Sequence, residues 1–540
     1  FISEVYYINA KDSIINGKVG IFFDGLDKEL QFIFNIYPPY PLKHHKSESI
    51  RFFNENLLEL NHIMEDGSVC IHNSHNTDFK QKLLIDFDSL KQWIEKYYIN
   101  KDKDIHYEHI IVSESLIDEN YYSYIFTNVH YPFSKGDFGK VKISHLYNTF
   151  FKEKPIQNFL VQSFVIDGVD ISCKWNSYYK SMKKQDLGLF YFLDEHPAKY
   201  NKFIYDNWQD FNRLISQEFL NFLYEFGIKN QKKHQNTLLP IFLGYKTIDN
   251  EIHWQVALIK FGNCPIVGKP EILLGVKTGR WNTNLIDSKI QWGLTRDSSD
   301  KYFFGRGTLD KSIIDKRILI MGIGAIGSIV AKTLTRGGCK SIDIVEYDVK
   351  EPENVCRSEY MFQFGLSDKV SELQSILFAI SPFIEVNILK KEYFEFIIKT
   401  FYKDVDAKKH LITNINEYDI VFDCTTDNDL MNILDSLDTE PEIINLSITN
   451  HANELVCAFS PNIYHFVNSQ FENVLDNDIE DLYEPTGCWS PTFKASYNDI
   501  NTLVQFAIKH INTLYSEGKK RNNFIITTSD DNLQLEIKEY

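Results

Sequence analysis

The chain has 540 residues, of which 43% are hydrophobic and 24% are charged, and its net charge is −17 at pH 7. This composition is typical of globular domains, and at roughly 150 residues per domain the length predicts three or four of them. The negative charge argues against a protein that binds nucleic acid through its phosphate backbone. The longest uncharged apolar run, 318–331, is rich in glycine and too short to span a bilayer, so we expect no membrane partner.

The cysteines of this chain predict free thiols. The 8 cysteines are scattered, and none of them forms a CxxC pair. So sparse a set in a long chain argues against a disulfide scaffold and against a zinc ribbon, and favours a cytoplasmic protein. The first residue is phenylalanine, so we expect the natural start of the chain to be missing, and its N-terminus gives no information on targeting.

Residues 1–125 predict an α+β domain that begins with a β-meander. Segments rich in β-branched and aromatic residues, separated by Asn-Gly and Asp-Gly turns, predict strands over 4–9, 18–23 and 30–36. The proline-rich stretch 37–41 excludes helix and central strand. An irregular loop through Cys70 follows, and the apolar spacing then predicts a helix over 86–98.

Residues 126–305 form a connecting domain for which the sequence predicts only the α+β class. We expect strands over 160–165 and 252–261 and an aromatic helix over 206–226. Residues 306–540 alternate between strands and helices. The expected order is strand 318–321, helix 326–334, strand 341–345, helix 370–380 and strand 420–422. Such alternation predicts a doubly wound, mostly parallel, Rossmann-like sheet.

A glycine-rich turn in this last region predicts a nucleotide site. Gly322, Gly324 and Gly327 follow an apolar strand and open a helix, so that the backbone can approach a phosphate at the positive helix N-terminus. Glu346 ends the second expected strand, where a carboxylate accepts hydrogen bonds from ribose hydroxyls. To this point an NAD-dependent oxidoreductase fits equally well.

Charged and polar residues beyond the glycine turn separate the two interpretations. They are Asp348, Asn354, Arg357, Lys369 and Asp427. Arginine and lysine neutralise phosphate charge that shifts in a transition state, and aspartate can hold Mg²⁺. An enzyme that cleaves between the α- and β-phosphates needs such groups, whereas an oxidoreductase does not.

In this order of motifs, the segment 318–457 resembles the ThiF/MoeB/ubiquitin-activating adenylation domain. The resemblance implies ATP and Mg²⁺ as cofactors, a homodimer, and activation of the C-terminal carboxylate of a partner protein as an acyl-adenylate. Glu346 stands where the family usually has aspartate. The Asp-Cys-Thr-Thr-Asp-Asn stretch is one residue longer than usual, so Asp423 and Asp427 are both candidates for the metal, and we favour Asp427. The family also tends to supply an arginine to the triphosphate upstream, which here would be Arg306.

Cys488 is the expected thioester-forming residue of this region. Gly487 and Pro491 flank it in a polar loop before a helix expected from residue 497, and a helix N-terminus favours the thiolate. By resemblance to ubiquitin-activating enzymes, this thiol captures the adenylate. The alternative is a buried structural cysteine, and that is how we interpret Cys339, Cys356, Cys424 and Cys457.

Cys70 is a second candidate thiol. The preceding meander, the proline-rich stretch, Gly67 three residues earlier and the later helix together resemble a ubiquitin-conjugating enzyme core. The His-Pro-Asn triplet of that family is absent, and Leu60-Asn61-His62 occupies its place, so His62 is the expected oxyanion donor. His72 and His75 either orient an incoming amine or lie in a solvated loop.

The order of conjugating, connecting and activating modules (1–125, 126–305 and 306–540) resembles the bacterial fusion enzymes of type II CBASS antiphage islands. The resemblance implies that an acyl group passes from Cys488 to Cys70 and then to a target amine. The implied partner is a cGAS-like nucleotidyltransferase or a stand-alone ubiquitin-like protein with a free C-terminus. Sulfur-carrier adenylation, an oxidoreductase and a catalytically dead scaffold remain as alternatives.

Overall fold

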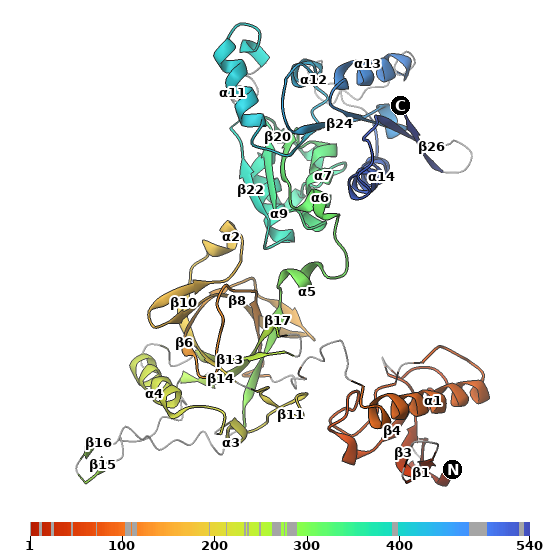
Figure 1. Ribbon diagram of the computed structural model, residues 1–540, viewed down its shortest axis with the longest axis vertical. Coiled ribbons are helices and arrows are strands. Elements are labelled where there is room, and N and C mark those ends of the chain that lie inside the picture. The colour runs from red at the N-terminus through yellow and green to blue at the C-terminus, as the bar shows by residue number, and fades with distance from the viewer. Residues whose placement is uncertain are drawn as a thin grey trace. The chain divides into compact units, whose positions relative to one another are not determined.

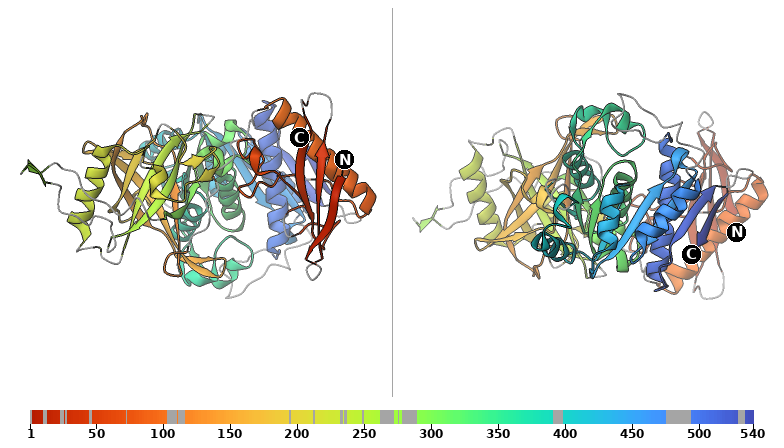
Figure 2. Two further views of the ribbon diagram at one scale, coloured as in Figure 1. Left: turned by 90° about the horizontal axis from the view of Figure 1, so that it is seen from below. Right: turned by 90° about the horizontal axis from the view of Figure 1, so that it is seen from above.

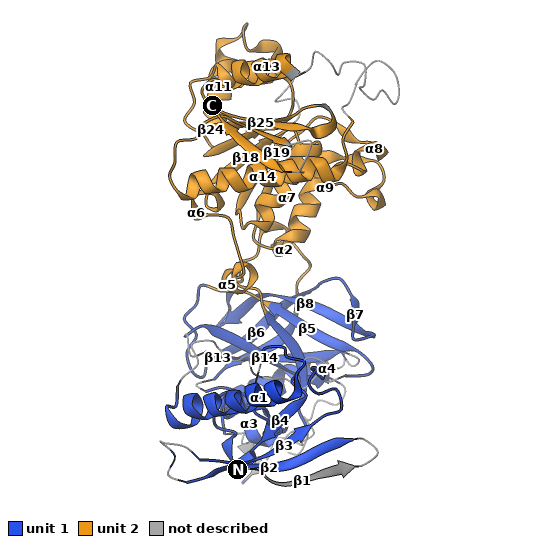
Figure 3. Cartoon of the chain, turned by 90° about the vertical axis from the view of Figure 1, so that its right-hand side faces the viewer, with its two compact units in different colours: residues 1–125, 130–171, 185–296 blue, residues 126–129, 172–184, 297–540 orange. Residues whose placement is uncertain are grey.

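The computed structural model describes most of the chain as two compact units (Figure 3). Unit 1 comprises residues 1–125, 130–171 and 185–296, and unit 2 comprises 126–129, 172–184 and 297–540. The described residues are 2–9, 13–22, 26, 28–44, 47–71, 73–102, 110, 116–193, 195–211, 213–231, 234, 237–247, 250–261, 272–274, 276–277, 289–390, 398–474, 494–528 and 534–540. Within them, no helix has both the length and the apolar character that crossing a membrane requires.

The first part of unit 1 is an antiparallel sheet in chain order with one long helix (Figure 1). Its strands are β1 (Ile2–Asn9), β2 (Ile14–Ile21), β3 (Leu30–Ile36) and β4 (Ile50–Phe53). Phe32, Phe34 and Phe52 of the sheet share one core with Leu90 and Trp93 of the helix. The strands are antiparallel neighbours in chain order, and the helix α1 (Phe79–Trp93) continues as a π-helical turn, Ile94–Ile99.

This helix begins earlier than the apolar spacing indicates. Asp78 caps it by accepting a hydrogen bond from the Gln81 N–H at 2.8 Å, so the helix starts at Phe79 rather than at residue 86. In the first two turns the buried positions hold Lys82 and Asp86 whereas Phe79 and Leu84 are exposed, which is why the apolar periodicity missed these turns.

The second part of unit 1 is a nine-stranded sheet that closes on itself. Its strand order is β5-β17-β14-β13-β10-β6-β8-β7; β9 pairs with β8, and β5 pairs in parallel with β8. We call the closed path the barrel. The strands are β5 (Tyr121–Phe126), β6 (Phe138–His145), β7 (Thr149–Phe151), β8 (Lys154–Ile166), β9 (Val169–Ser172), β10 (Gln185–Phe192), β13 (Leu238–Lys246), β14 (Ile252–Lys260) and β17 (Gln291–Asp297).

Helical segments cover one outer side of the barrel. The helix expected over 206–226 is wrong as a single element, because the chain forms α3 (Trp208–Phe211) and α4 (Gln217–Gln231) instead. The Ser216 hydroxyl accepts a hydrogen bond from the Phe219 N–H at 3.2 Å and so starts a new helix. Both helices share a core with β10, β13 and β14, and Figure 2 shows α4 alongside these strands. A short hairpin, β11 (Ala198–Lys199) and β12 (Phe203–Ile204), precedes α3.

Unit 2 contains the expected doubly wound sheet. Its strand order is β22-β19-β18-β23-β24-β25-β26-β27. The first five strands are parallel and the last three are antiparallel additions. The strands are β18 (Arg317–Met321), β19 (Ser341–Val345), β22 (Glu385–Ile388), β23 (Ile420–Asp423), β24 (Glu442–Ile448), β25 (Glu454–Phe459), β26 (Phe524–Thr528) and β27 (Leu535–Glu539).

Alternating side chains of the central strands serve two separate cores. Ile318 and Ile320 pack against α7 (Ala325–Arg336), α9 (Lys369–Ile380) and α14 (Tyr497–Ser516). Leu319 and Met321 pack against α11 (Val405–Ile415), α12 (Asn428–Asp435) and α13 (Ile463–Val474). Helices therefore cover both faces, and the strand order reverses at β18, where ligands bind in folds of this kind.

Candidate functional sites

Glycine is required at one position of the turn that follows β18 and at one position in the first turn of α7. Gly322 has a φ of +77°, and a Cβ there would lie 2.8 Å from Thr425. A Cβ on Gly327 would lie 2.0 Å from the carbonyl oxygen of Gly322. The turn is thus packed closely between β18 and the segment after β23, and it delivers the chain to the N-terminus of α7 directly after Gly324. Its backbone N–H groups and the helix dipole suit a phosphate.

The side chains of Glu346 and Tyr360 fix this glycine turn from two sides. Glu346 Oε2 accepts a hydrogen bond from the Ile323 N–H at 3.1 Å, and Oε1 accepts from the Tyr347 N–H at 2.9 Å. The Tyr360 hydroxyl donates to the Ile323 carbonyl at 2.5 Å. Both backbone polar groups of Ile323 are therefore held. Burial raises the pKa of Tyr360 well above its usual value, and nearby carboxylates add to the effect.

Tyr360 was not predicted, although Arg357 was. The available signal was a single aromatic residue three positions further on, in a stretch of mixed polarity. Glu346 was expected at the ribose, and its position at the end of β19 fits that role. The longer glutamate side chain also reaches the glycine turn, which is a structural role that the sequence did not predict.

Two of the predicted charged residues meet beside the turn. Lys369 opens α9, is buried, and its ammonium forms an ion pair with Asp348. Asn354 lies in α8 (Pro352–Val355), where its side-chain oxygen accepts a hydrogen bond from the Glu351 N–H at 2.9 Å. Arg357 follows this short helix and is half-buried. Asn354 therefore shapes the segment that carries Arg357.

A buried ion pair lies behind this segment and was not predicted. Lys350 and Glu372 are both almost fully buried and lie 2.6 Å apart. Glu372 also accepts a hydrogen bond from the Met361 N–H at 2.7 Å, and Lys350 donates to the Met361 carbonyl at 2.8 Å. The pair anchors the residues after Arg357 to α9. Breaking a buried ion pair is strongly destabilising, because one charge is then left buried without its partner.

The structure distinguishes the two candidate metal ligands. Asp423 is 1% exposed and accepts hydrogen bonds from the Thr425 hydroxyl at 2.7 Å and the Asn445 amide at 2.9 Å. Burial raises the pKa of Asp423. Asp427 is only half-buried, and its Oδ1 caps α12 by accepting from the Asp429 and Leu430 N–H groups. Asp427 is therefore the accessible carboxylate of the two.

Other predicted residues are less closely tied to the turn. Arg306 is exposed in the segment between α5 (Asp300–Phe304) and α6 (Lys311–Ile314), outside the hydrogen-bonded set described above. Cys488 lies outside the described residues and remains a prediction. Within the described part of the chain, no group of three histidine, cysteine or carboxylate side chains is placed to hold a metal ion.

The remaining cysteines of unit 2 fall into two classes. Cys339, Cys424 and Cys457 are buried as expected, and burial raises their pKa, that of Cys339 to about 12. The expectation for Cys356 is wrong, because this residue is exposed. Cys356 is the C-cap of α8, and none of the residues of this short helix is buried. Its thiol lies 3.1 Å from the Glu353 carbonyl.

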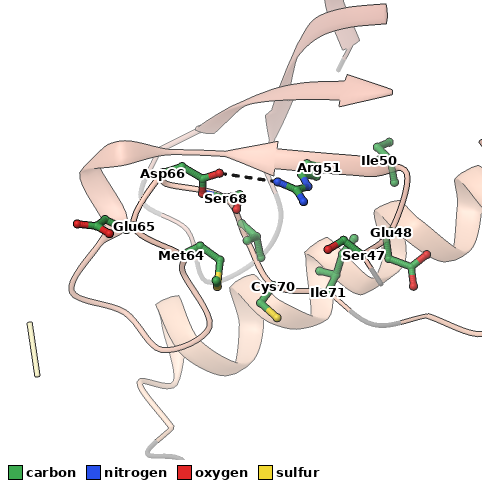
Figure 4. Close-up of a pocket in the computed structure, with 11 residues that line it drawn as sticks. Ser47, Glu48, Ile50, Arg51, Met64, Glu65, Asp66, Ser68, Cys70 and Ile71 are labelled. Carbon is green, nitrogen blue, oxygen red and sulfur yellow. Dashed lines mark hydrogen bonds and ion pairs between the residues drawn. The ribbon is translucent and has the colours of Figure 1, made fainter. Parts of the chain in front are cut away.

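Cys70 lies at the edge of a cavity of about 530 Å³ in unit 1 (Figure 4). The thiol side chain is partly exposed. The cavity is lined by Ser47, Glu48, Ile50, Arg51, Met64, Glu65, Asp66, Ser68, Val69, Cys70 and Ile71. Gly67, three residues before the cysteine, has a φ of +78°, and a Cβ there would lie 3.1 Å from the Glu55 backbone nitrogen. The tight turn before Cys70 therefore requires glycine.

His62 is adjacent to Cys70 through its backbone. The Cys70 N–H donates to the His62 carbonyl at 2.8 Å, so the expected proximity of these two residues is present. The His62 ring packs on Tyr97, with 4.9 Å between the ring centroids. The oxyanion role of the imidazole stays a prediction. His75 is exposed, and His72 lies outside the described residues.

A buried polar network holds the chain after Cys70. Lys82 pairs with Glu48 at 2.9 Å and also with Asp86. Asn73 donates its amide to Asp86 at 2.5 Å, and its backbone N–H donates to Glu48 at 3.1 Å. The Tyr40 hydroxyl donates to Asp86 at 3.1 Å. The sequence signal for this network was the spacing of Lys82 and Asp86, which lie on the same face of α1 as the buried Leu90 and Trp93.

Comparisons with known proteins agree with the architecture of unit 2. Residues 301–437 match the model of the ThiF family. The ATP-dependent ubiquitin transferase-like protein Cap2 of Enterobacter hormaechei is 25% identical over 265 residues, which are 47% of this chain and 42% of that protein. Ubiquitin-like modifier-activating enzyme 5 of Caenorhabditis briggsae is 34% identical over 79 residues, 14% of this chain and 18% of that enzyme.

The chain thus spans less than half the length of the curated relatives it matches. Among solved structures, E. coli MccB with ATP has a TM-score of 0.29 and 13% identity, and the match covers 42% of this chain and 65% of that one. PaaA has a TM-score of 0.30, also at 13% identity, with the same two shares. Residues 301–437 carry a ThiF-family domain.

Proposed function

We propose that the ThiF-family domain uses ATP to adenylate the C-terminal carboxylate of a partner protein, and that the acyl group then passes through Cys488 and Cys70 to a target amine. The family match and the relative described as an ATP-dependent ubiquitin transferase-like protein support an adenylating enzyme. The conjugating half of the proposal is supported by the meander, the Cys70 loop and the following helix.

The observation that carries this proposal is that these groups follow neighbouring strands at the carboxyl edge of the parallel sheet. The glycine turn follows β18, Glu346 follows β19, and Asp427 follows β23, which are neighbouring strands. Asp348 and Lys369 pair beside them. This arrangement offers backbone N–H groups for phosphates, a carboxylate for ribose and a buried ammonium for phosphate charge.

The residues present suit an ATP–Mg²⁺ substrate. Mg²⁺ is usually held by one or two carboxylates together with phosphate oxygens and water. Asp427 would supply the protein carboxylate, because Asp423 already uses its oxygens on Thr425 and Asn445. Arg357 and, more remotely, Arg306 would supply further positive charge to the triphosphate.

The proposed chemistry has four steps. A carboxylate oxygen of the partner attacks the α-phosphorus, the bond to the α,β-bridging oxygen breaks, and pyrophosphate leaves. The thiolate of Cys488 then attacks the acyl carbon and AMP leaves. Cys70 takes over the acyl group by thiol exchange, which frees Cys488. A target amine finally attacks, its proton passes to solvent, and the Cys70 thiolate leaves.

The partner is identified only by its chemistry, which is a protein with an accessible C-terminal carboxylate. A cGAS-like nucleotidyltransferase is our first candidate and a stand-alone ubiquitin-like protein the second. The half-buried Cys70 at a cavity favours both over a sulfur-carrier adenylyltransferase, which would need no thiol there. We further propose a homodimer and a cytoplasmic location.

ATP–pyrophosphate exchange with each candidate partner tests the first step. We expect exchange with one partner, and Lys369→Met should slow it by about a hundredfold because a buried phosphate-neutralising charge is lost. Lys316→Met is the matched control, since Lys316 is exposed in the same unit. An enzyme that supports no exchange with any carboxylate partner would contradict the proposal.

Intact-mass measurement of thioesters tests the later steps. Cys488→Ala should abolish both adducts, and Cys70→Ala should leave only the Cys488 adduct. His62→Phe keeps a ring against Tyr97 but removes the imidazole N–H, so amide formation should fall about a hundredfold while Cys70 loading persists. Normal conjugation by Cys70→Ala would remove Cys70 from the proposed mechanism.

A further inference from the structure

A buried lysine from the barrel side of unit 1 contacts the loop that leads to Cys70. Lys202 follows the tip of the β11–β12 hairpin, where Tyr200 and Asn201 both have positive φ, at 52° and 60°. The residue is 6% exposed. Its ammonium donates to the Leu60 carbonyl at 2.6 Å and to the Ile63 carbonyl at 3.2 Å.

These two carbonyls belong to the turn that contains His62. His62 has a φ of +58°, a conformation that costs free energy for any residue except glycine and persists only where neighbours impose it. The His62 carbonyl in turn accepts the Cys70 N–H at 2.8 Å. A continuous path of hydrogen bonds and one short turn therefore connects Lys202 with the backbone of Cys70.

Burial of this ammonium needs a reason. Removing a lysine from water is costly, and an apolar side chain of similar length would fill the same space without that cost. An ammonium differs from it by offering several donors at one point, so it can join two carbonyls that would otherwise be independent. The contact restrains the geometry of residues 60–63 rather than merely filling a gap.

We propose that Lys202 is a positioning residue for the Cys70 site, through which the domain of residues 126–305 sets the turn that carries His62 and the Cys70 amide. The role in acyl transfer depends on the proposed function, whereas the restraint on the loop does not. The middle domain would thus act on the conjugating step and not only connect two modules.

Hydrogen exchange of the full-length chain tests the restraint without any partner. In Lys202→Met we expect the amides of residues 60–71 to exchange about tenfold faster, because charged hydrogen bonds that hold the turn are lost. Lys202→Arg should retain most of the protection. Lys199→Met is the control, since Lys199 is exposed on the same hairpin and its nearest carboxylate is 4.0 Å away. Unchanged exchange in β13 and β14 will show that the barrel stays folded.

The rate of Cys70 alkylation by iodoacetamide, followed across pH on the Cys70 peptide, is the second partner-independent measurement. We expect its pH profile to change in Lys202→Met and to match the parent chain in Lys199→Met. If neither the exchange of residues 60–71 nor the alkylation profile differs between the two variants, the inference is overturned.

The enzymatic assays separate this inference from the proposed function. Lys202→Met should leave ATP–pyrophosphate exchange unchanged, since that step uses residues of unit 2, and should slow the arrival of the acyl group on Cys70 about tenfold. A parent chain that never forms a Cys70 thioester, together with altered exchange in Lys202→Met, would refute the proposed function and still support the restraint.

Discussion

The buried network after Cys70 makes a quantitative prediction about Lys82. Its side chain is 3% exposed, and the two carboxylates that it contacts, Glu48 and Asp86, are 2% and 0% exposed. Lys82→Met would leave two buried negative charges without their shared cation, a change that typically costs about 3–5 kcal/mol. Asn73 and Tyr40 still donate to these carboxylates and Lys43 still lies 3.3 Å from Glu48, so we expect the lower end, about 3 kcal/mol.

Native-state hydrogen exchange of α1 in the full-length chain measures this loss. A change of about 3 kcal/mol corresponds to roughly 150-fold faster exchange of the most protected α1 amides. Lys91→Met is the control, because Lys91 is 59% exposed and its ion pair with Asp88 is 3.9 Å long. That variant should change stability by less than about 0.5 kcal/mol. Equal exchange in the two variants would refute the reasoning.

The same network predicts a pH dependence. Burial alone would raise the pKa of Glu48, but hydrogen bonds from Lys82 and from the Asn73 N–H outweigh it, and the pKa is lowered from 4.5. A carboxyl with a lowered pKa in the folded state contributes stability above its ordinary pKa, and this is lost as the pH falls through the folded value. Without Lys82 the burial of Glu48 raises its pKa, so this carboxyl protonates at a higher pH in Lys82→Met than in the parent chain. The stability difference between the two should therefore be largest near neutral pH and shrink as the pH falls into the acidic range.

Three further predictions concern backbone and side-chain positions that the structure constrains. Gly327→Ala should abolish ATP binding by disrupting the turn, because its added Cβ would lie 2.0 Å from the Gly322 carbonyl oxygen. Gly324→Ala, whose added Cβ meets nothing within 4 Å, should leave the fold intact. Calorimetric titration with ATP and circular dichroism distinguish the two variants. Tyr360→Phe should weaken ATP binding about fivefold, in line with about 1 kcal/mol for one lost hydrogen bond, and an unchanged dissociation constant would contradict this. Gly67→Ala should slow transfer to Cys70, while Gly136→Ala, which has positive φ but open space around it, should reduce only stability, by about 1 kcal/mol in urea unfolding.

Local sequence signals predicted unit 2 well, because its elements are specified by short-range patterns. Strands 318–321 and 341–345 are apolar runs that became buried central strands, and the glycine spacing reflects contacts within one turn. Glu346 was expected at the end of the second of these strands, and it directly follows β19.

The errors and omissions in unit 1 have different physical causes. The prediction of one helix over 206–226 was wrong because an aromatic-rich stretch is compatible with both helical and non-helical segments. The Ser216 cap starts a separate helix there. The closure of the barrel depends on a parallel pairing of β5 with β8, across a span in which β6 and β7 intervene. Sequence patterns carry information about which faces are apolar, but they do not specify which distant strand completes a sheet.

The buried lysines show why the surroundings of Cys70 could not be predicted although the cysteine itself could. Lysine side chains are most often exposed, so a sequence-based prediction places any single lysine in solvent. Lys82 and Lys202 depart from it because they have partners in distant parts of the chain, which are Glu48 for Lys82 and two loop carbonyls for Lys202. One lysine fixes the chain after Cys70 and the other fixes the turn before it. If both act on the same thiol, its reactivity depends on two contacts that are remote from it in sequence, and a search for catalytic residues confined to the Cys70 loop would overlook both.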